Sequence, residues 1–142
     1  MESNQPVRDA WLIELEHAAA FRAALRRLAR RTEAAVAAVG LTPRRYDLLI
    51  ALRAAGGEAT INSLASLLQM RQNAVTELVK RAESAGVARR TRSTRDRRVV
   101  YVSITPEGET RLRRGFEALR GERTALADAL GLLEPGPERP SG

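Results

Sequence analysis

The sequence predicts a mostly α-helical protein with a small β-hairpin, arranged as a winged helix-turn-helix that dimerises through its N- and C-terminal helices. Three observations support this fold class. Most apolar residues recur at steps of three and four, the period of an amphipathic helix. Two short helical segments follow one another with a tight turn between them. One stretch near residue 100 changes to strict alternation, which is typical of a half-buried strand.

The N-terminal segment, residues 1–39, is expected to be a dimerisation helix. The period runs from about Arg8 to Val39, and Gly40 follows as a helix terminator. Residues 1–6 are expected to be a frayed leader. The apolar stripe is too long for one small lobe to cover, which favours a partner helix. Its members are Trp11, Leu15, Ala18, Phe21, Leu25, Leu28, Ala35 and Val39.

Residues 40–104 are expected to form one compact lobe that begins with two helices. Thr42 is the expected N-cap of the first, because threonine accepts from free N–H groups and Pro43 suits the first turn. Residues 60–61 are expected to form a very short strand. Asn62 or Ser63 is then expected to cap the second helix.

The second half of this lobe carries a longer helix and the hairpin. A turn at residues 69–71 leads into a helix expected over residues 72–85, which ends at Gly86. Strands are expected over residues 87–92 and 98–104, on either side of a polar turn.

The C-terminal segment, residues 105–133, is expected to supply further dimerisation helices. Its apolar residues follow alternate steps of four and three, a heptad seam that Gly121 is expected to interrupt. Residues 134–142 contain three prolines and are expected to be disordered. The seam consists of Leu112, Phe116, Leu119, Leu126, Leu130 and Leu133, with Arg123 at the polar position.

Composition excludes several function classes and favours a polyanionic partner. The formal net charge is +7, and Lys80 is the only lysine among 24 basic residues. Cysteine is absent, which excludes disulfides, thiolate metal sites and thiol redox sensing. We therefore expect no cofactor and no metal. Neither a signal peptide nor a membrane-spanning run is visible, so we expect a cytoplasmic protein without a membrane partner.

No catalytic constellation can be assembled from the sequence. The single histidine, His17, has no local Ser or Asp partner and is interpreted as a partly exposed helix residue. Phosphate-binding glycine loops are absent too. The sequence therefore does not predict an enzyme.

The helix expected over residues 72–85 offers a face for reading DNA. Polar residues project away from its apolar side, and Arg and Gln at its start suit bidentate contacts with guanine and adenine. An ordinary solvated helix face is the alternative interpretation. The candidate contacts to bases or backbone from this region are Arg71, Gln72, Asn73, Thr76 and Lys80.

The hairpin turn strengthens that prediction, because arginines crowd it. Arginine side chains at this density repel one another on a bare surface, whereas bound phosphates would relieve the repulsion. A flexible turn without a ligand is the alternative. Arg98 is expected to enter the minor groove, and Asp96 to shape the tip by holding guanidinium or backbone N–H groups. The other candidate phosphate contacts here are Arg92, Arg95 and Arg97.

These residues resemble the MarR family of bacterial regulators. Asp96-Arg97-Arg98 with Ile104-Thr105 and Gly108 is similar to the family's wing signature. Residues 75–81 with Gly86-Val87 resemble its recognition helix and exit. Gln69 departs from the pattern, because the family often has glycine there.

The resemblance implies a homodimer whose end helices intertwine and whose two winged lobes bind a pseudo-palindromic duplex, usually as a repressor. It also implies a cleft for a small aromatic or anionic effector between the dimer helices and the DNA-binding lobe. The candidate effector residues are Trp11, His17, Phe21, Arg22 and Tyr46. Simple dimer core is the alternative for the aromatic residues among them.

The function expected from these observations is a sequence-specific, double-stranded DNA-binding transcriptional regulator. A repressor relieved by a small-molecule effector fits best. The alternative is a winged helix that binds proteins or RNA without site-specific DNA binding.

Overall fold

The computed structural model describes residues 9–131 of the chain. The expected leader at residues 1–6, the expected tail at residues 134–142 and Leu133 of the seam lie outside the described residues. Within the described range, no helix has the length and apolar character needed to cross a membrane.

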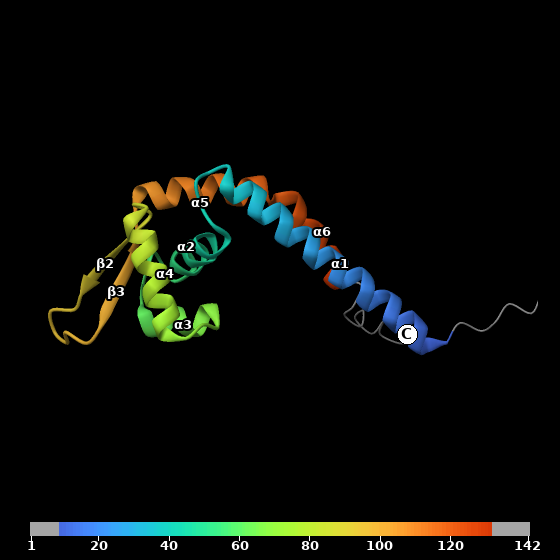
Figure 1. Ribbon diagram of the computed structural model, residues 1–142, viewed down its shortest axis with the longest axis horizontal. Helices are drawn as coiled ribbons and strands as arrows, with labels where there is room; N and C mark the ends of the chain where they lie inside the picture. Colours follow the sequence, from blue (N-terminus) through green and yellow to red (C-terminus); the bar gives the residue numbers. More distant parts are fainter. Residues whose placement is uncertain (1–8, 132–142) are drawn as a thin grey trace, which may run out of the picture. The chain divides into compact units, whose positions relative to one another are not determined.

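Helices dominate the structure, as the fold class predicts (Figure 1). Their order with the strands is α1, α2, β1, α3, α4, β2, β3, α5 and α6. The helices are α1 (Ala10–Ala37), α2 (Pro43–Ala54), α3 (Ile61–Leu68), α4 (Gln72–Ser84), α5 (Pro106–Ala118) and α6 (Arg120–Gly131). The strands are β1 (Glu58–Thr60), β2 (Ala88–Arg92) and β3 (Val100–Ile104).

The chain divides into two compact units, which are described separately below. One unit consists of Thr32–Leu119 and holds α2 to α5 with the sheet. The other combines Met1–Arg31 with Arg120–Gly142, and so contains most of α1 together with α6.

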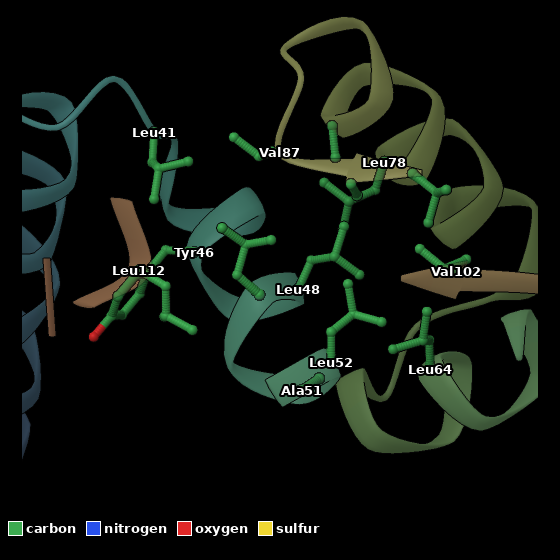
Figure 2. Packing of buried hydrophobic residues seen from close by; sticks show 14 of the residues in the cluster. Leu41, Tyr46, Leu48, Ala51, Leu52, Leu64, Leu78, Val87, Val102 and Leu112 are labelled. Atoms are coloured by element: carbon green, nitrogen blue, oxygen red, sulfur yellow. The ribbon is translucent and has the colours of Figure 1, made fainter. Parts of the chain in front are cut away.

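The hydrophobic core of the Thr32–Leu119 unit is aliphatic and centres on α2. Leu48, Leu49 and Leu52 are completely buried there. Figure 2 shows Leu64 and Val102 near Leu48 and Leu52, which brings α3 and the sheet onto the same core. This core fixes one face of α4 through Val75, Leu78, Val79 and Ala82, all buried. The opposite face of α4 is therefore left for solvent or a ligand.

The sheet joins the two strands of the expected hairpin with the short strand expected before α3. β1 pairs antiparallel with β3, which also pairs with β2, so the order is β1-β3-β2. The expected strand at residues 60–61 is displaced to Glu58–Thr60, because Thr60 pairs with Tyr101 while Ile61 already begins α3. The hairpin predicted from alternation is present, and β1 closes one edge of it.

The cap of α3 also differs from the expectation of Asn62 or Ser63. Thr60 is the N-cap, with extended φ and ψ of −81° and 159°, and its Oγ1 accepts from the backbone N of Ser63 at 3.1 Å. At the other end, Gln69 takes the left-handed conformation with φ 52° and ψ 45°. The turn before α4 thus has the glycine-like geometry without a glycine.

The C-terminal helix breaks two residues before Gly121, at Leu119, which is buried and caps α5. Upstream, Thr105 caps α5 and ties it to the hairpin. Its hydroxyl donates to the carbonyl O of Gly86 at 2.6 Å and accepts from the N of Gly108 at 3.0 Å. These contacts hold the exit of α4 and the end of β3 together.

Candidate nucleic-acid interface

The exposed face of α4 carries the polar side chains singled out in the sequence. Asn73, Glu77 and Lys80 are exposed, and Thr76 is half-buried. All four make local contacts. Asn73 Oδ1 accepts from the N of Ala74 at 2.9 Å, and Lys80 Nζ lies 3.3 Å from Glu77 Oε1. Because both members of the ion pair are half-exposed or more, a ligand can displace it at small cost.

Thr76 points its hydroxyl proton at its own helix. Its Oγ1 donates to the carbonyl O of Gln72 at 2.9 Å. That leaves an oxygen lone pair and a methyl group for any partner. The geometry therefore suits a contact to a base amino group or a thymine methyl better than donation to a phosphate.

The N-terminus of α4 is electropositive and open. Arg71 is the N-cap and provides no side-chain cap, and the first turn contains no acid. Arg71 and Gln72 are both exposed. Free N–H groups, the helix dipole and the Arg71 guanidinium therefore combine at the end of the helix that would enter a groove.

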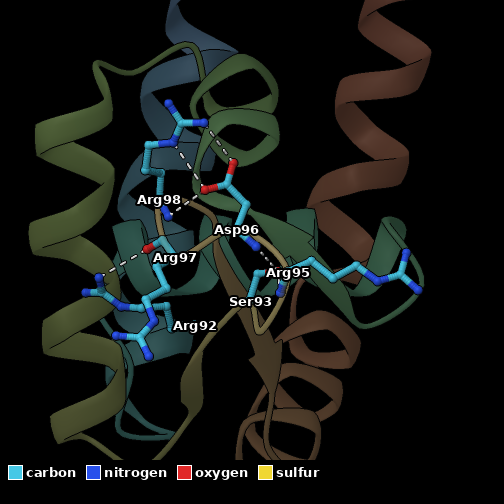
Figure 3. Close-up of polar contacts among 6 residues, drawn as sticks. All are labelled: Arg92, Ser93, Arg95, Asp96, Arg97 and Arg98. Carbon is cyan, nitrogen blue, oxygen red and sulfur yellow. Dashed lines mark hydrogen bonds and ion pairs between the residues drawn. The ribbon is translucent and has the colours of Figure 1, made fainter.

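The wing tip is ordered by hydrogen bonds from short polar side chains (Figure 3). Ser93 Oγ accepts from the backbone N of Arg95 at 3.2 Å and of Asp96 at 3.3 Å. The backbone N of Val99 donates to the carbonyl O of Asp96 at 3.0 Å. The loop is therefore a closed turn in which each arginine leaves the backbone in a set direction.

Asp96 accepts three hydrogen bonds from Arg98. Asp96 Oδ1 accepts from the backbone N of Arg98 at 3.0 Å and from its Nε at 3.2 Å, and Oδ2 accepts from a terminal nitrogen at 3.3 Å. These bonds lower the pKa of the Asp96 carboxyl below its ordinary value. The Arg98 side chain is nevertheless 91% exposed. Asp96 thus orients the guanidinium without covering it.

The remaining wing arginines are exposed and differently held. A terminal nitrogen of Arg92 donates to the carbonyl O of Arg97 at 3.1 Å, which ties the end of β2 to the wing loop. Figure 3 shows Arg95 and Arg98 extending toward different sides of the loop. The Thr32–Leu119 unit thus brings the predicted DNA-contacting residues of α4 and the wing into one body.

One ion pair at this site was missed by the sequence analysis. Glu83 Oε2 accepts from the backbone N of Arg90 at 2.9 Å, and its Oε1 lies 2.9 Å from a terminal nitrogen of Arg90. These bonds lower the pKa of Glu83. Glu83 thereby links the last turn of α4 to β2. The only sequence signal was an acid near a helix end and a base early in the next strand.

The predicted effector residues fall in both units. His17 and Phe21 line a cavity of about 490 Å³ between α1 and α6, whose walls include Arg27 and Arg31. Trp11 is 64% exposed. Neither it nor Arg22 lines that cavity.

Tyr46 lies elsewhere, in the core of the Thr32–Leu119 unit. Its side chain is 5% exposed and faces Gly115 of α5. The structure therefore brings His17 and Phe21 together and gives Tyr46 a packing role.

Comparison with known proteins finds similarity to one family. Residues 39–99 match the family model described as MarR family. This segment contains α2 to α4, β2 and the wing tip. Over this segment the chain is similar to the MarR family. The family resemblance predicted from the wing and recognition-helix residues is thereby confirmed.

One curated relative and several solved structures agree with this family. The transcriptional repressor MdtR of Bacillus subtilis is 31% identical over 94 residues, which cover 66% of this chain and 58% of MdtR. The chain thus matches little more than half the length of that relative. A MarR mutant from E. coli in complex with operator DNA is 19% identical, with a TM-score of 0.70 and coverage of 88% of this chain and 93% of that chain.

Two other solved structures share this fold. AbsC of Streptomyces coelicolor is 24% identical, with a TM-score of 0.66 and coverage of 87% of this chain and 84% of AbsC. BpsR of Bordetella bronchiseptica, whose DNA binding is regulated by 6-hydroxynicotinic acid, is 20% identical. Its TM-score is 0.60, and the alignment covers 77% of this chain and 89% of BpsR. At these identities the likeness confirms the winged helix-turn-helix fold.

Proposed function

We propose that this chain is a member of the MarR family and a sequence-specific regulator that binds double-stranded DNA, acting as a repressor that a small-molecule effector releases. The observation that carries the proposal is the pairing, in one unit, of an exposed polar α4 with an arginine-rich wing. A groove-reading helix and a phosphate-binding hairpin are the two parts that such recognition needs.

Each part has its own task in this proposal. Gln72, Asn73 and Thr76 contact base edges or nearby backbone and set sequence preference. Arg98, held by Asp96, enters the narrow minor groove, where negative potential is strongest. The phosphate contacts that supply affinity come from Arg71, Arg92, Arg95 and Arg97, with Lys80 at the far side of the α4 face.

The proposed assembly is a cytoplasmic homodimer without catalytic activity. A two-fold axis would place two α4 helices about one DNA turn apart, which matches a pseudo-palindromic site. Exposed apolar residues on α1, among them Trp11, Leu15 and Leu25, are the surface that a second copy would cover.

The proposed effector site is the cavity between α1 and α6. Its walls combine Phe21 and Leu28 with the cationic Arg27, which suits a small aromatic anion. A change of affinity by an effector needs a coupling free energy of only about 1–3 kcal/mol. The alternative for this surface remains dimer core.

Duplex binding by an Arg98→Ala variant tests the DNA-binding role. Binding to the gene's own upstream duplex and to a random duplex is measured over a salt series, with single-stranded RNA as a competitor. We expect Arg98→Ala to weaken specific binding about tenfold, because the minor-groove contact is lost. Arg114→Ala, an exposed arginine on α5, is the matched control.

Two results would contradict the proposal. Equal affinity of Arg98→Ala and Arg114→Ala for the upstream duplex at matched salt would remove Arg98 from the interface. A wild-type protein that prefers RNA, or that binds duplex without salt dependence, would favour the RNA-binding or protein-binding alternative.

A further inference from the structure

A shallow cleft lies between the first turn of α2 and the last turns of α4. It is lined by Arg45 of α2 and by Lys80, Arg81, Ser84 and Ala85 of α4, and we call it the α2–α4 cleft. Both helices belong to the Thr32–Leu119 unit (Figure 1). The cleft therefore has a defined shape within a single rigid lobe.

The α2–α4 cleft concentrates positive charge that the described part of the chain does not neutralise. Lys80 shares the carboxylate of Glu77, but no acidic group is paired with Arg45 or Arg81 among residues 9–131. Arg45 is half-buried, so its guanidinium has less water around it than a fully exposed one. Cations gathered in this way repel one another unless an anion joins them.

The N-terminus of α2 adds to the same excess of positive charge. Arg44 and Arg45 occupy the first turn of α2, which contains no acidic residue. The N-terminus of a helix carries a partial positive charge, so cations there are unfavourable and an anion is favourable. Thr42 Oγ1 caps only the N of Arg45, at 3.3 Å. A bound anion would relieve both the charge cluster and the dipole.

The cleft continues the proposed reading face of α4. At 100° per residue, Asn73, Lys80 and Ser84 lie on one stripe of the helix. The rise from Asn73 to Ser84 is about 16 Å at 1.5 Å per residue. The major groove is only about 12 Å wide. When the first turn of α4 meets base edges, the far end of the stripe reaches a flanking sugar-phosphate strand.

We infer that the α2–α4 cleft seats a backbone phosphate of duplex DNA, with Arg45 and Arg81 as its ligands and Lys80 and Ser84 at its rim. The inference rests on the proposed function and extends the DNA interface from α4 and the wing to the first turn of α2. A contact to phosphate fixes register and adds affinity without reading sequence. The cleft thus gives each lobe an anchor in addition to the wing.

Salt-dependent binding of substituted proteins tests the seat. Arg45→Gln, Arg81→Gln and the double variant are compared with Arg114→Gln, which removes the same charge from an exposed site on α5. Each loss of a phosphate contact is expected to reduce the slope of log Kobs against log salt by about 0.9. The reduction is expected to be equal on upstream and random duplexes, so the ratio of the two affinities stays constant.

Two further measurements separate charge from folding and DNA from free anions. Arg45→Lys keeps the charge and is expected to restore most of the slope. Thermal melting of every variant shows whether the fold is intact. Calorimetric titration with inorganic phosphate in the absence of DNA tests for a free anion as the occupant.

The outcomes distinguish this inference from the proposed function. In one outcome the wild type binds duplex with a steep salt slope, and the folded double variant has the same slope as Arg114→Gln. This outcome overturns the phosphate seat but leaves the proposed function intact. Loss of inorganic phosphate binding in the double variant with an unchanged duplex slope assigns the cleft to a free anion and also overturns it. Absence of salt-dependent duplex binding in the wild type overturns both.

Discussion

At the residue scale, Gly108 is the position where an added Cβ would disrupt the packing of α5 against Val87 and Ile104. A Cβ at Gly108 would overlap the carbonyl O of Val87 and lie 3.0 Å from Cγ1 of Ile104. The backbone atom cannot move away, because Thr105 N donates to that same carbonyl at 3.2 Å. We expect Gly108→Ala to lower the free energy of unfolding by about 1–3 kcal/mol, as overpacking does. Urea denaturation measures this directly.

Gly121 provides the control for that substitution. Nothing lies within 4 Å of a Cβ built there, and the residue is helical. Gly121→Ala should therefore stabilise the protein slightly, by up to about 1 kcal/mol, because alanine loses less backbone entropy. If Gly108→Ala were as stable as Gly121→Ala, the close packing of α5 against the exit of α4 would be disproved.

Individual residues also show where sequence reasoning reached its limit. Thr42 was predicted as a cap because it precedes a proline that begins a helix, and Thr105 stands in the same position before Pro106. Thr60 was missed because Asn62 and Ser63 are equally good caps by composition. The choice depends on the pairing of Thr60 with Tyr101 of β3, a contact that no local pattern contains. Long-range pairing thus sets this boundary.

At the element scale, the link from Glu83 to Arg90 controls how α4 is joined to the wing. Glu83→Gln removes the charge but keeps the size of the side chain. We expect a loss of about 0.5–1 kcal/mol in unfolding free energy, because the ion pair is partly exposed and screened. Duplex affinity should fall as well, since β2 then leaves α4 with a less fixed direction. Glu77→Gln, which affects only the exposed pair with Lys80, is the stability control.

The same pair predicts a pH dependence. The pKa of Glu83 is lowered in the folded protein, so its contribution is complete above its unfolded value near 4.5. The contribution is lost as the pH falls through the lower folded-state value. The stability difference between wild type and Glu83→Gln should therefore shrink between neutral pH and acid. A difference that stayed constant from pH 7 to pH 3 would show that Glu83 acts by shape alone.

Elements in which the helical spacing of apolar residues repeats over several turns were predicted well from the sequence. The expected helix at residues 72–85 agrees with α4 to one residue, because its apolar side repeats over three turns. β1 was misplaced because three residues contain too little alternation to fix a strand. The break before α6 fell at Leu119 because burial of that leucine, rather than glycine alone, ends α5.

At the scale of the whole molecule, a helical stripe identifies a buried face but not the element that covers it. Trp11, Phe21 and Tyr46 were grouped in one expected pocket on this basis. The structure places Tyr46 in the core of the Thr32–Leu119 unit, while Phe21 lines the cavity between α1 and α6. Sequence patterns therefore grouped candidate DNA-binding residues that the structure keeps in one unit, because they share one short segment. They also grouped candidate effector residues that the structure places in different units.

The exposed apolar face of α1 leads to a prediction about assembly. Trp11 is the only tryptophan, and its 64% exposure in a single chain makes its fluorescence a reporter of coverage by a second copy. Leu25 is 41% exposed on the same face, and Leu25→Glu places a charge where that copy would pack. We expect the variant to run at half the wild-type mass, with red-shifted emission.

Duplex binding should report the same loss of assembly. A monomer binds DNA through one lobe without the second lobe of the dimer, so affinity should fall by about a hundredfold or more. Arg30→Glu, about 140° from Leu25 around the helix, should remain dimeric and keep its emission maximum. If wild type and Leu25→Glu had equal mass and emission, this face of α1 would not be the dimer surface. The two lobes would then have to meet through other residues to bind a two-fold DNA site.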